Sequence, residues 1–307
     1  NAMREATADF AEATRDATVS QQNWLTAYTE DRRERLRTQQ AEDRLRLVFS
    51  PSCAAVATTD DPVELQRVLD TCRVSQVEGG RIVPAETFED FEAILGLSDA
   101  LQDYAESLIL LTADWSEDRK ALSEEASATG EALQGLHGSI AKISRSKSDG
   151  VIEQAPAIGG IIGTVAGAYL EAERLDALRD ILGAADPLVA IATEYLRQAD
   201  ELALSQDRKD ALTVLSARTD ALRDLPINVA PPVFRAAQDD VWAAHEELLR
   251  ITSVQSPFPQ MREAHASLLL AAQKGGDADE LQAAVMDILE LAKSVKDVAE
   301  ALSDEEQ

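Results

Sequence analysis

Apolar residues recur in steps of four and three along most of this chain, and no other feature constrains its fold as strongly. Such spacing places side chains on one stripe of an α-helix, as in coiled coils. Short breaks separate the runs, so neighbouring helices are expected to be antiparallel. The sequence therefore predicts an all-α fold, an elongated bundle of long antiparallel helices with coiled-coil-like seams and no significant sheet. Two runs are the clearest: Leu97, Leu101, Tyr104, Leu108, Leu111 and Trp115, and Leu281, Val285, Ile288, Ala292, Val295, Ala299 and Leu302.

The pattern divides the chain into three predicted regions. Residues 4–50 are predicted to form a long N-terminal helix, and residues 51–96 an irregular region with short helices. Residues 97–307 are predicted to form the main helical bundle. Within it, one helix could run from 98 to 143, and the pair Asp186–Pro187 has the residues typical of a helix start. The segment 79–84 is the single strand-like piece, and it is too short to form a sheet alone.

The charge of the chain excludes one class of partner. There are 56 acidic and 29 basic residues, which gives a formal net charge of −27. Because nucleic-acid binding depends on basic residues that neutralise phosphates, we expect no nucleic-acid partner. The sharpest basic cluster contains four arginines among acidic residues. It is interpreted as a solvated helix face, with a docking patch for an acidic partner as the alternative; its arginines are Arg32, Arg33, Arg35 and Arg37.

The two cysteines bear on the cellular compartment. Cys53 and Cys72 flank a short helix-like segment that begins at Asp61–Pro62. We expect a disulfide between them rather than two buried thiols, because both lie in the one irregular region. In the chain-entropy model, a loop of about 20 residues closed in this way contributes about 3 kcal/mol. A disulfide favours an oxidising location such as a bacterial periplasm or cell envelope, with the cytoplasm as the alternative.

One segment without any charge stands out, from Ala155 to Leu170. Its glycines Gly159, Gly163 and Gly167 recur every four residues and would form a smooth groove on a helix. A membrane-spanning helix needs about 20 apolar residues, and this run has sixteen. We therefore interpret the groove as a site of close helix packing, with ligand contact and lipid contact as the alternatives.

The same segment resembles the Gly/Ala-rich apolar segment of helical pore-forming toxins, which are soluble bundles before they insert. The resemblance covers only the sixteen residues from Ala155 to Leu170. It implies a membrane-active protein that inserts this segment.

The motifs that carry common catalytic or metal chemistry are not found in the sequence. None of His137, His245 and His265 has a glutamate three residues before it, as di-iron bundles require. A phosphate-binding loop, a nucleophile elbow and a zinc-protease motif are also not found. We expect no cofactor and no metal, and nothing in the sequence supports an enzyme. The three histidines are interpreted as structural or solvated.

These observations lead to one functional prediction with two alternatives. The prediction is a non-enzymatic helical protein of the bacterial cell envelope that acts as a protein-interaction or structural module, through a protein partner or self-association. The first alternative is membrane activity through residues 155–170. The second is binding of a small ligand in the core of the helices.

Overall fold

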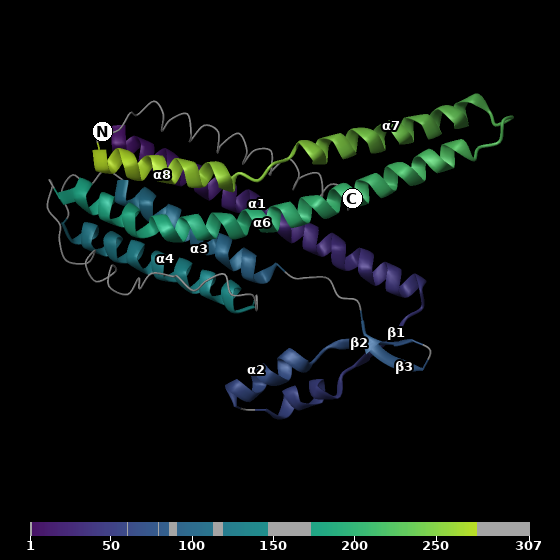
Figure 1. Cartoon of the computed structure of the whole chain (residues 1–307), viewed down its shortest axis with the longest axis horizontal. Coiled ribbons are helices and arrows are strands. Elements are labelled where there is room, and N and C mark those ends of the chain that lie inside the picture. Colours follow the sequence, from purple (N-terminus) through teal and green to yellow (C-terminus); the bar gives the residue numbers. More distant parts are fainter. Residues whose placement is uncertain are drawn as a thin grey trace. The chain divides into compact units, whose positions relative to one another are not determined.

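The computed structural model describes residues 2–59, 61–78, 80–85, 91–112, 119–146 and 173–274. This part of the chain is mostly helical and includes one small three-stranded sheet (Figure 1). It divides into two compact units. The larger unit comprises Asn1–Ala27 and Phe91–Gln307, and the smaller unit comprises Tyr28–Asp90. Each unit is described by itself below.

Long helices build the larger unit. Helix α1 spans Ala2–Glu42 and contributes its first part to this unit. The others are α3 (Glu92–Thr112), α4 (Arg119–Ser146), α6 (Glu173–Arg223), α7 (Pro231–Ser253) and α8 (Phe258–Lys274). Helix α3 packs against α4, while α6 packs against α3, α4, α7 and α8 (Figure 1). Helix α6 is therefore the element that contacts most of the others.

The core of this unit lies where α1, α3, α4, α6 and α8 meet. Predicted stripe positions of α1 and α3 are buried there, among them Phe10, Leu101 and Tyr104. The remaining predicted positions of these two stripes that the core contains are Ala13, Ala17, Leu97 and Leu108. Because aromatic residues are 4% of the chain, aliphatic side chains and alanines fill most of this core. Their burial is the main source of stability for helices of this kind.

Two expectations about helix boundaries in this unit were wrong. A single helix from 98 to 143 does not form, because α3 ends at Thr112 and α4 packs back against it. The apolar run in the sequence ends at Trp115, and the next five residues, 116–120, are all polar or charged. Conversely, α6 continues through Pro187, which lacks the N–H that a helix interior uses. Leu182 and Leu188 are buried on either side of this proline, and their burial compensates for the lost hydrogen bond.

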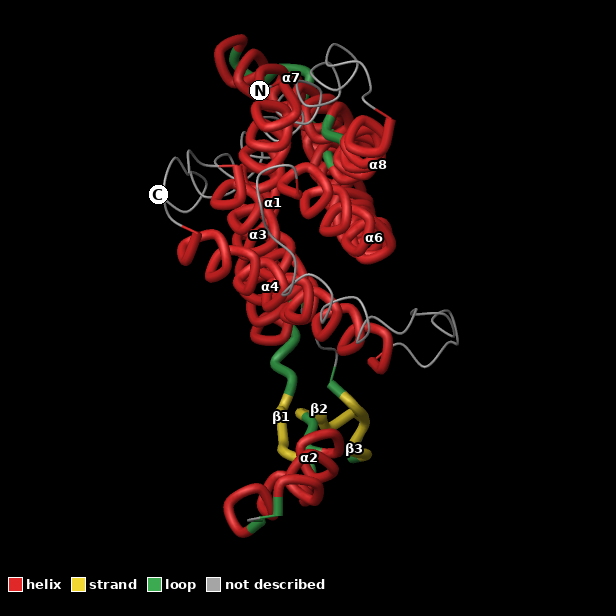
Figure 2. The backbone as a smooth tube through the Cα atoms, turned by 90° about the vertical axis from the view of Figure 1, so that its left-hand side faces the viewer, coloured by secondary structure: helices red, strands yellow, loops and turns green. Residues whose placement is uncertain are grey.

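The smaller unit contains the sheet, whose strands appear in Figure 2. Strands β1 (Arg46–Phe49), β2 (Val74–Glu78) and β3 (Arg81–Pro84) lie in the order β1-β2-β3, and both pairings are antiparallel. Arg46 pairs with Val77, which in turn pairs with Ile82. Between β1 and β2 the chain forms a 3₁₀ helix, η1 (Pro51–Thr58), and helix α2 (Pro62–Thr71). Asp61 caps α2, as predicted, because its Oδ1 accepts a hydrogen bond from the backbone N–H of Val63.

The sheet corrects the expectation of no significant sheet. The strand-like segment that ends at Pro84 is not isolated, because β2 pairs with it across a turn at Gly80. Gly80 has a φ of +80°, a backbone conformation that glycine adopts without strain. The long N-terminal helix also ends earlier than expected, at Glu42, and residues from Arg46 join the sheet. The three strands have only four or five residues each, which is too few for alternating apolar and polar residues to stand out. The sequence pattern therefore did not predict the sheet.

Two predicted segments lie outside the described residues. They are the glycine segment 155–170, with Gly159, Gly163 and Gly167, and the C-terminal stripe from Leu281 to Leu302. Their predicted roles stay predictions. Among the helices that the structure does describe, none contains a stretch apolar and long enough to span a membrane.

Candidate functional site

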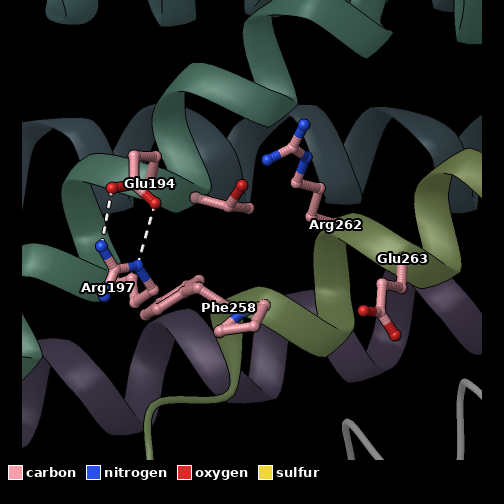
Figure 3. Close-up of a pocket in the computed structure, with 7 residues that line it drawn as sticks. Glu194, Arg197, Phe258, Arg262 and Glu263 are labelled. Atoms are coloured by element: carbon pink, nitrogen blue, oxygen red, sulfur yellow. Dashed lines mark hydrogen bonds and ion pairs between the residues drawn. The ribbon is translucent and has the colours of Figure 1, made fainter.

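A shallow cleft of about 350 Å³ lies between α6 and α8 (Figure 3). Glu194 and Arg197 of α6 form its charged wall, and Phe258 and Arg262 of α8 lie across from them. The Glu194 carboxylate accepts two hydrogen bonds from Arg197, from Nε at 2.9 Å and from Nη2 at 2.7 Å. These bonds, with a further one from Gln198, lower the pKa of Glu194 to about 2.

A second cleft of about 490 Å³ continues along α6 towards the end of α7 and shares Arg197 with the first. Arg197 also bonds Glu201, so its guanidinium has carboxylate partners on both sides. Both clefts are open to solvent along their length, unlike the closed apolar cavities that hold most small ligands. Three of their charged groups, Glu194, Arg197 and Glu201, are paired with one another. This arrangement gives a small ligand no strong hold, and ligand binding in the core stays a prediction.

A buried histidine links α3, α6 and α8. The Tyr104 hydroxyl lies 3.0 Å from Nε2 of His265, and Nδ1 of His265 lies 3.2 Å from Oδ1 of Asp186. His265 donates to Asp186 and lowers the pKa of that carboxyl, while burial raises the pKa of Tyr104. Both rings are fully buried, and Phe10 packs against His265 with ring centroids 5.6 Å apart. No substrate could reach this group, so its geometry suits a structural role.

A buried carboxylate joins α1 to α6. Oδ1 of Asp200 accepts a hydrogen bond of 2.6 Å from Nε2 of Gln21, which also donates to the carbonyl of Leu196 at 3.3 Å. Asp200 is 1% exposed. Desolvation by burial raises its pKa to about 7, although Ser256 and Gln21 partly offset the rise. Sequence reasoning missed this group, because its spacing on α6 resembles that of an ordinary surface aspartate.

The most exposed part of the larger unit is a pair of antiparallel helices, the α6–α7 arm, which comprises residues 205–253 (Figure 1). Ile251 is the one buried residue of α7, and α6 has none beyond Leu204. Several large apolar side chains of the arm face solvent instead. Trp242 is 64% exposed and Ile227 is fully exposed; Leu212, Val214, Val233, Phe234 and Leu249 complete the set.

The arm still has an internal seam. The half-buried residues of α7 recur in steps of four and three at 237, 241, 244 and 248, and those of α6 at 211, 215 and 222 also lie on one stripe. Arg218 of α6 lies 4.0 Å from Asp240 of α7, which fixes the level at which the two helices meet. Two helices that pack along one seam leave the two flanks of the pair exposed. The arm therefore presents long, partly apolar flanks that nothing in the described part of the chain covers.

The arginine cluster predicted as a solvated face or docking patch lies on α1, in the smaller unit. Arg33, Arg35 and Arg37 are exposed and Arg32 is half-buried. Arg35 pairs with Asp31 at 2.8 Å and Arg37 with Glu34 at 3.8 Å. These pairs within one helix are typical of a solvated face, and the docking role stays a prediction.

The two cysteines lie together in the smaller unit. Their sulfur atoms are 2.01 Å apart, a disulfide distance, and the bridge joins η1 to the end of α2. Ser50 and Ser52 support it, since both hydroxyls donate to the carbonyl of Thr71. Phe49 and Ile82, by contrast, are 78% and 70% exposed. The small unit therefore depends on the covalent link more than on its core.

The fold and these sites define a predominantly helical protein with a small three-stranded sheet, a disulfide between η1 and the end of α2, and an exposed helical arm. Within the described residues, no group of three histidine, cysteine or acidic side chains is placed to hold a metal ion. No family model matches the chain, and no curated protein or solved structure is significantly similar to it. The function is therefore inferred from the geometry of the chain itself.

Proposed function

We propose that this protein is a protein-interaction module whose binding surface is the α6–α7 arm. The observation that carries the proposal is the exposure of the arm, where large apolar side chains face solvent and, among the described residues, only Ile251 is buried. Large apolar side chains that gather on an exposed surface often mark an interaction site.

The chemistry of the exposed residues fits protein binding better than catalysis. Tryptophan is enriched among the residues that contribute most to interfaces, and Trp242 projects from the middle of α7 with His245 against its ring at 5.9 Å. Full burial of one such side chain contributes about 1.5–3 kcal/mol. Trp242 and Leu249 lie two turns apart on one flank of α7, so a single partner helix could cover both.

We further propose that the protein works in the cell envelope of a bacterium, outside the reducing cytoplasm. The support is the Cys53–Cys72 bridge, because structural disulfides persist in oxidising compartments. For this role we propose an elongated bundle of helices with coiled-coil-like seams. The membrane-active alternative depends on residues 155–170, and leakage of liposomes on addition of the protein tests it separately.

A photoreactive phenylalanine analogue in place of Trp242 tests the proposed binding surface. The variant is produced in the native cells, irradiated, and compared with a control that carries the analogue in place of Val63. Val63 is 80% exposed but lies on α2 in the other unit, so it matches Trp242 in exposure and polarity. We expect protein adducts at position 242 that are several-fold more abundant than those at position 63.

Equal adduct yields at the two positions, or none at position 242, would overturn the proposal. Mass spectrometry of the adducts then identifies the partner chain and distinguishes a second copy of this protein from a different one.

A further inference from the structure

The two flanks of the α6–α7 arm differ in charge. The Arg218–Asp240 contact bridges α6 and α7 on one flank, so it defines which stripes of the two helices lie on the same side. An α-helix has 3.6 residues per turn, so the positions on each flank of α6 and α7 can be counted from the half-buried residues of the seam. The arm as a whole has eight acidic and six basic residues between 205 and 253, a net charge of −2 in a chain of −27. Repulsion between copies is therefore weaker here than the net charge of the whole chain would give.

The flank away from the Arg218–Asp240 contact has no acidic residue. Its stripe on α6 runs through positions 205, 209, 212, 216, 219 and 223, and its stripe on α7 through 235, 238, 242, 245, 249 and 252. We name this flank the basic face. It combines three cationic side chains with three large exposed apolar ones: Lys209, Leu212, Arg223, Arg235, Trp242 and Leu249. Arg223 and Arg235 also contact carboxylates at its outer edge, Asp220 and Asp239.

The opposite flank, here named the acidic face, has the complementary character. It carries four carboxylates and several alanines, and it is represented by Asp207, Asp210, Ala221, Asp240, Ala243 and Glu247. Arg218 lies at its inner edge, where it contacts Asp240. Arg250 also lies on this flank, where it donates two hydrogen bonds to Glu247, so four carboxylates and two arginines leave the acidic face with a net negative charge. The two faces are therefore opposite in charge.

We infer that a second copy of this chain binds to the arm, with the basic face of one copy against the acidic face of the next. This inference rests on the proposed function and names its partner. Because the two contacting surfaces are different, the contact is head-to-tail, and each copy keeps one free face of each kind in a growing assembly. The expected products are short open stacks or a closed ring rather than a simple symmetric dimer.

The size of the arm sets the strength of this contact. The helices run side by side over about 19 residues, which is about 28 Å at 1.5 Å per residue, and two helices are about 20 Å wide. A pair of such faces therefore buries about 1,100 Å² in total, near the lower limit for specific interfaces. We expect association in the micromolar range, weakened by added salt because opposite charges contribute to it.

Reciprocal charge reversal tests the inference. In Lys209→Glu/Arg235→Glu the basic face becomes acidic, and in Asp210→Lys/Asp240→Lys the acidic face becomes basic. Each variant alone presents two faces of like charge and should sediment as a monomer at concentrations where the natural protein forms larger species. An equal mixture restores opposite charges at both kinds of contact, because one variant has two acidic faces and the other has two basic faces. It should assemble again, into species that contain both variants. The control variant Arg44→Glu/Arg81→Glu changes the net charge by −4, as Lys209→Glu/Arg235→Glu does, but at exposed positions of the other unit, and it should assemble like the natural protein.

The inference is overturned if the natural protein remains a monomer up to about 100 micromolar, well above the expected dissociation constant. It is also overturned if either variant assembles alone, or if the mixture stays monomeric while circular dichroism shows both variants folded. In those cases a cross-link from position 242 to a different protein would leave the proposed function intact.

Discussion

The buried carboxyl group of Asp200 makes a sharp prediction about stability. Its pKa rises from the ordinary aspartate value of 3.8 to about 7 in the folded chain, chiefly because burial removes water from the charged form. Between these two values the folded state holds a proton that the unfolded state has released. Stability contributed by this group is therefore present at low pH and is lost as the pH rises towards 7. A shift of this size corresponds to about 4 kcal/mol at pH 8.

Asp200→Asn removes the titration and keeps the shape. The asparagine carbonyl still accepts the hydrogen bond from Gln21, and no charge forms at high pH. We expect the variant to have nearly the stability of the natural protein at pH 4, and to exceed it by up to about 4 kcal/mol at pH 8.

Urea denaturation followed by circular dichroism at pH 4, 6 and 8 measures this difference. Asp239→Asn is the matched control, because it removes one carboxylate from the exposed surface of α7, and its stability difference should not change in this way with pH. If Asp200→Asn is as destabilising at pH 8 as at pH 4, the carboxyl group is not protonated in the fold and the prediction is wrong.

Three other sites give predictions that can be measured. Tyr104→Phe leaves Nε2 of His265 buried without its partner and should cost about 1–3 kcal/mol of unfolding free energy, measured by urea denaturation. Cys53→Ser/Cys72→Ser should remove about 3 kcal/mol from the smaller unit, seen as faster hydrogen exchange in β1–β3 with little change in α3 and α8. Trp242→Ala should leave stability within about 0.5 kcal/mol, as for most surface changes, but should abolish self-association, measured by sedimentation.

The helical part of the fold was largely predictable from the sequence, because burial on one side of a long helix leaves a periodic trace. Leu97, Leu101 and Leu108 all lie in the core that their spacing indicated. The sheet was not predictable in this way. Strands of four or five residues, such as Arg46–Phe49, are shorter than the windows over which periodicity can be recognised.

The candidate binding surface was only partly predictable. The basic stripe on α6 and α7 can be written down from spacing alone, but the sequence does not reveal that, in the described part of the chain, residues 205–250 of these helices contain no buried side chain. Exposure of Trp242 is a property of tertiary packing. Similarly, Pro187 follows a helix-capping residue type, yet buried neighbours on both sides keep α6 continuous through it. In each case the long-range contacts decided between two local possibilities.

Hydrogen–deuterium exchange at two protein concentrations, about 1 and about 100 micromolar, spans the expected dissociation constant and tests most directly whether the arm is the binding surface. We predict that peptides from 205–223 and 231–253 exchange more slowly at the higher concentration, and that peptides from α2 and the sheet do not change. Slower exchange confined to elements outside the arm, together with unchanged exchange in α7, would contradict the assignment of the arm as the binding surface.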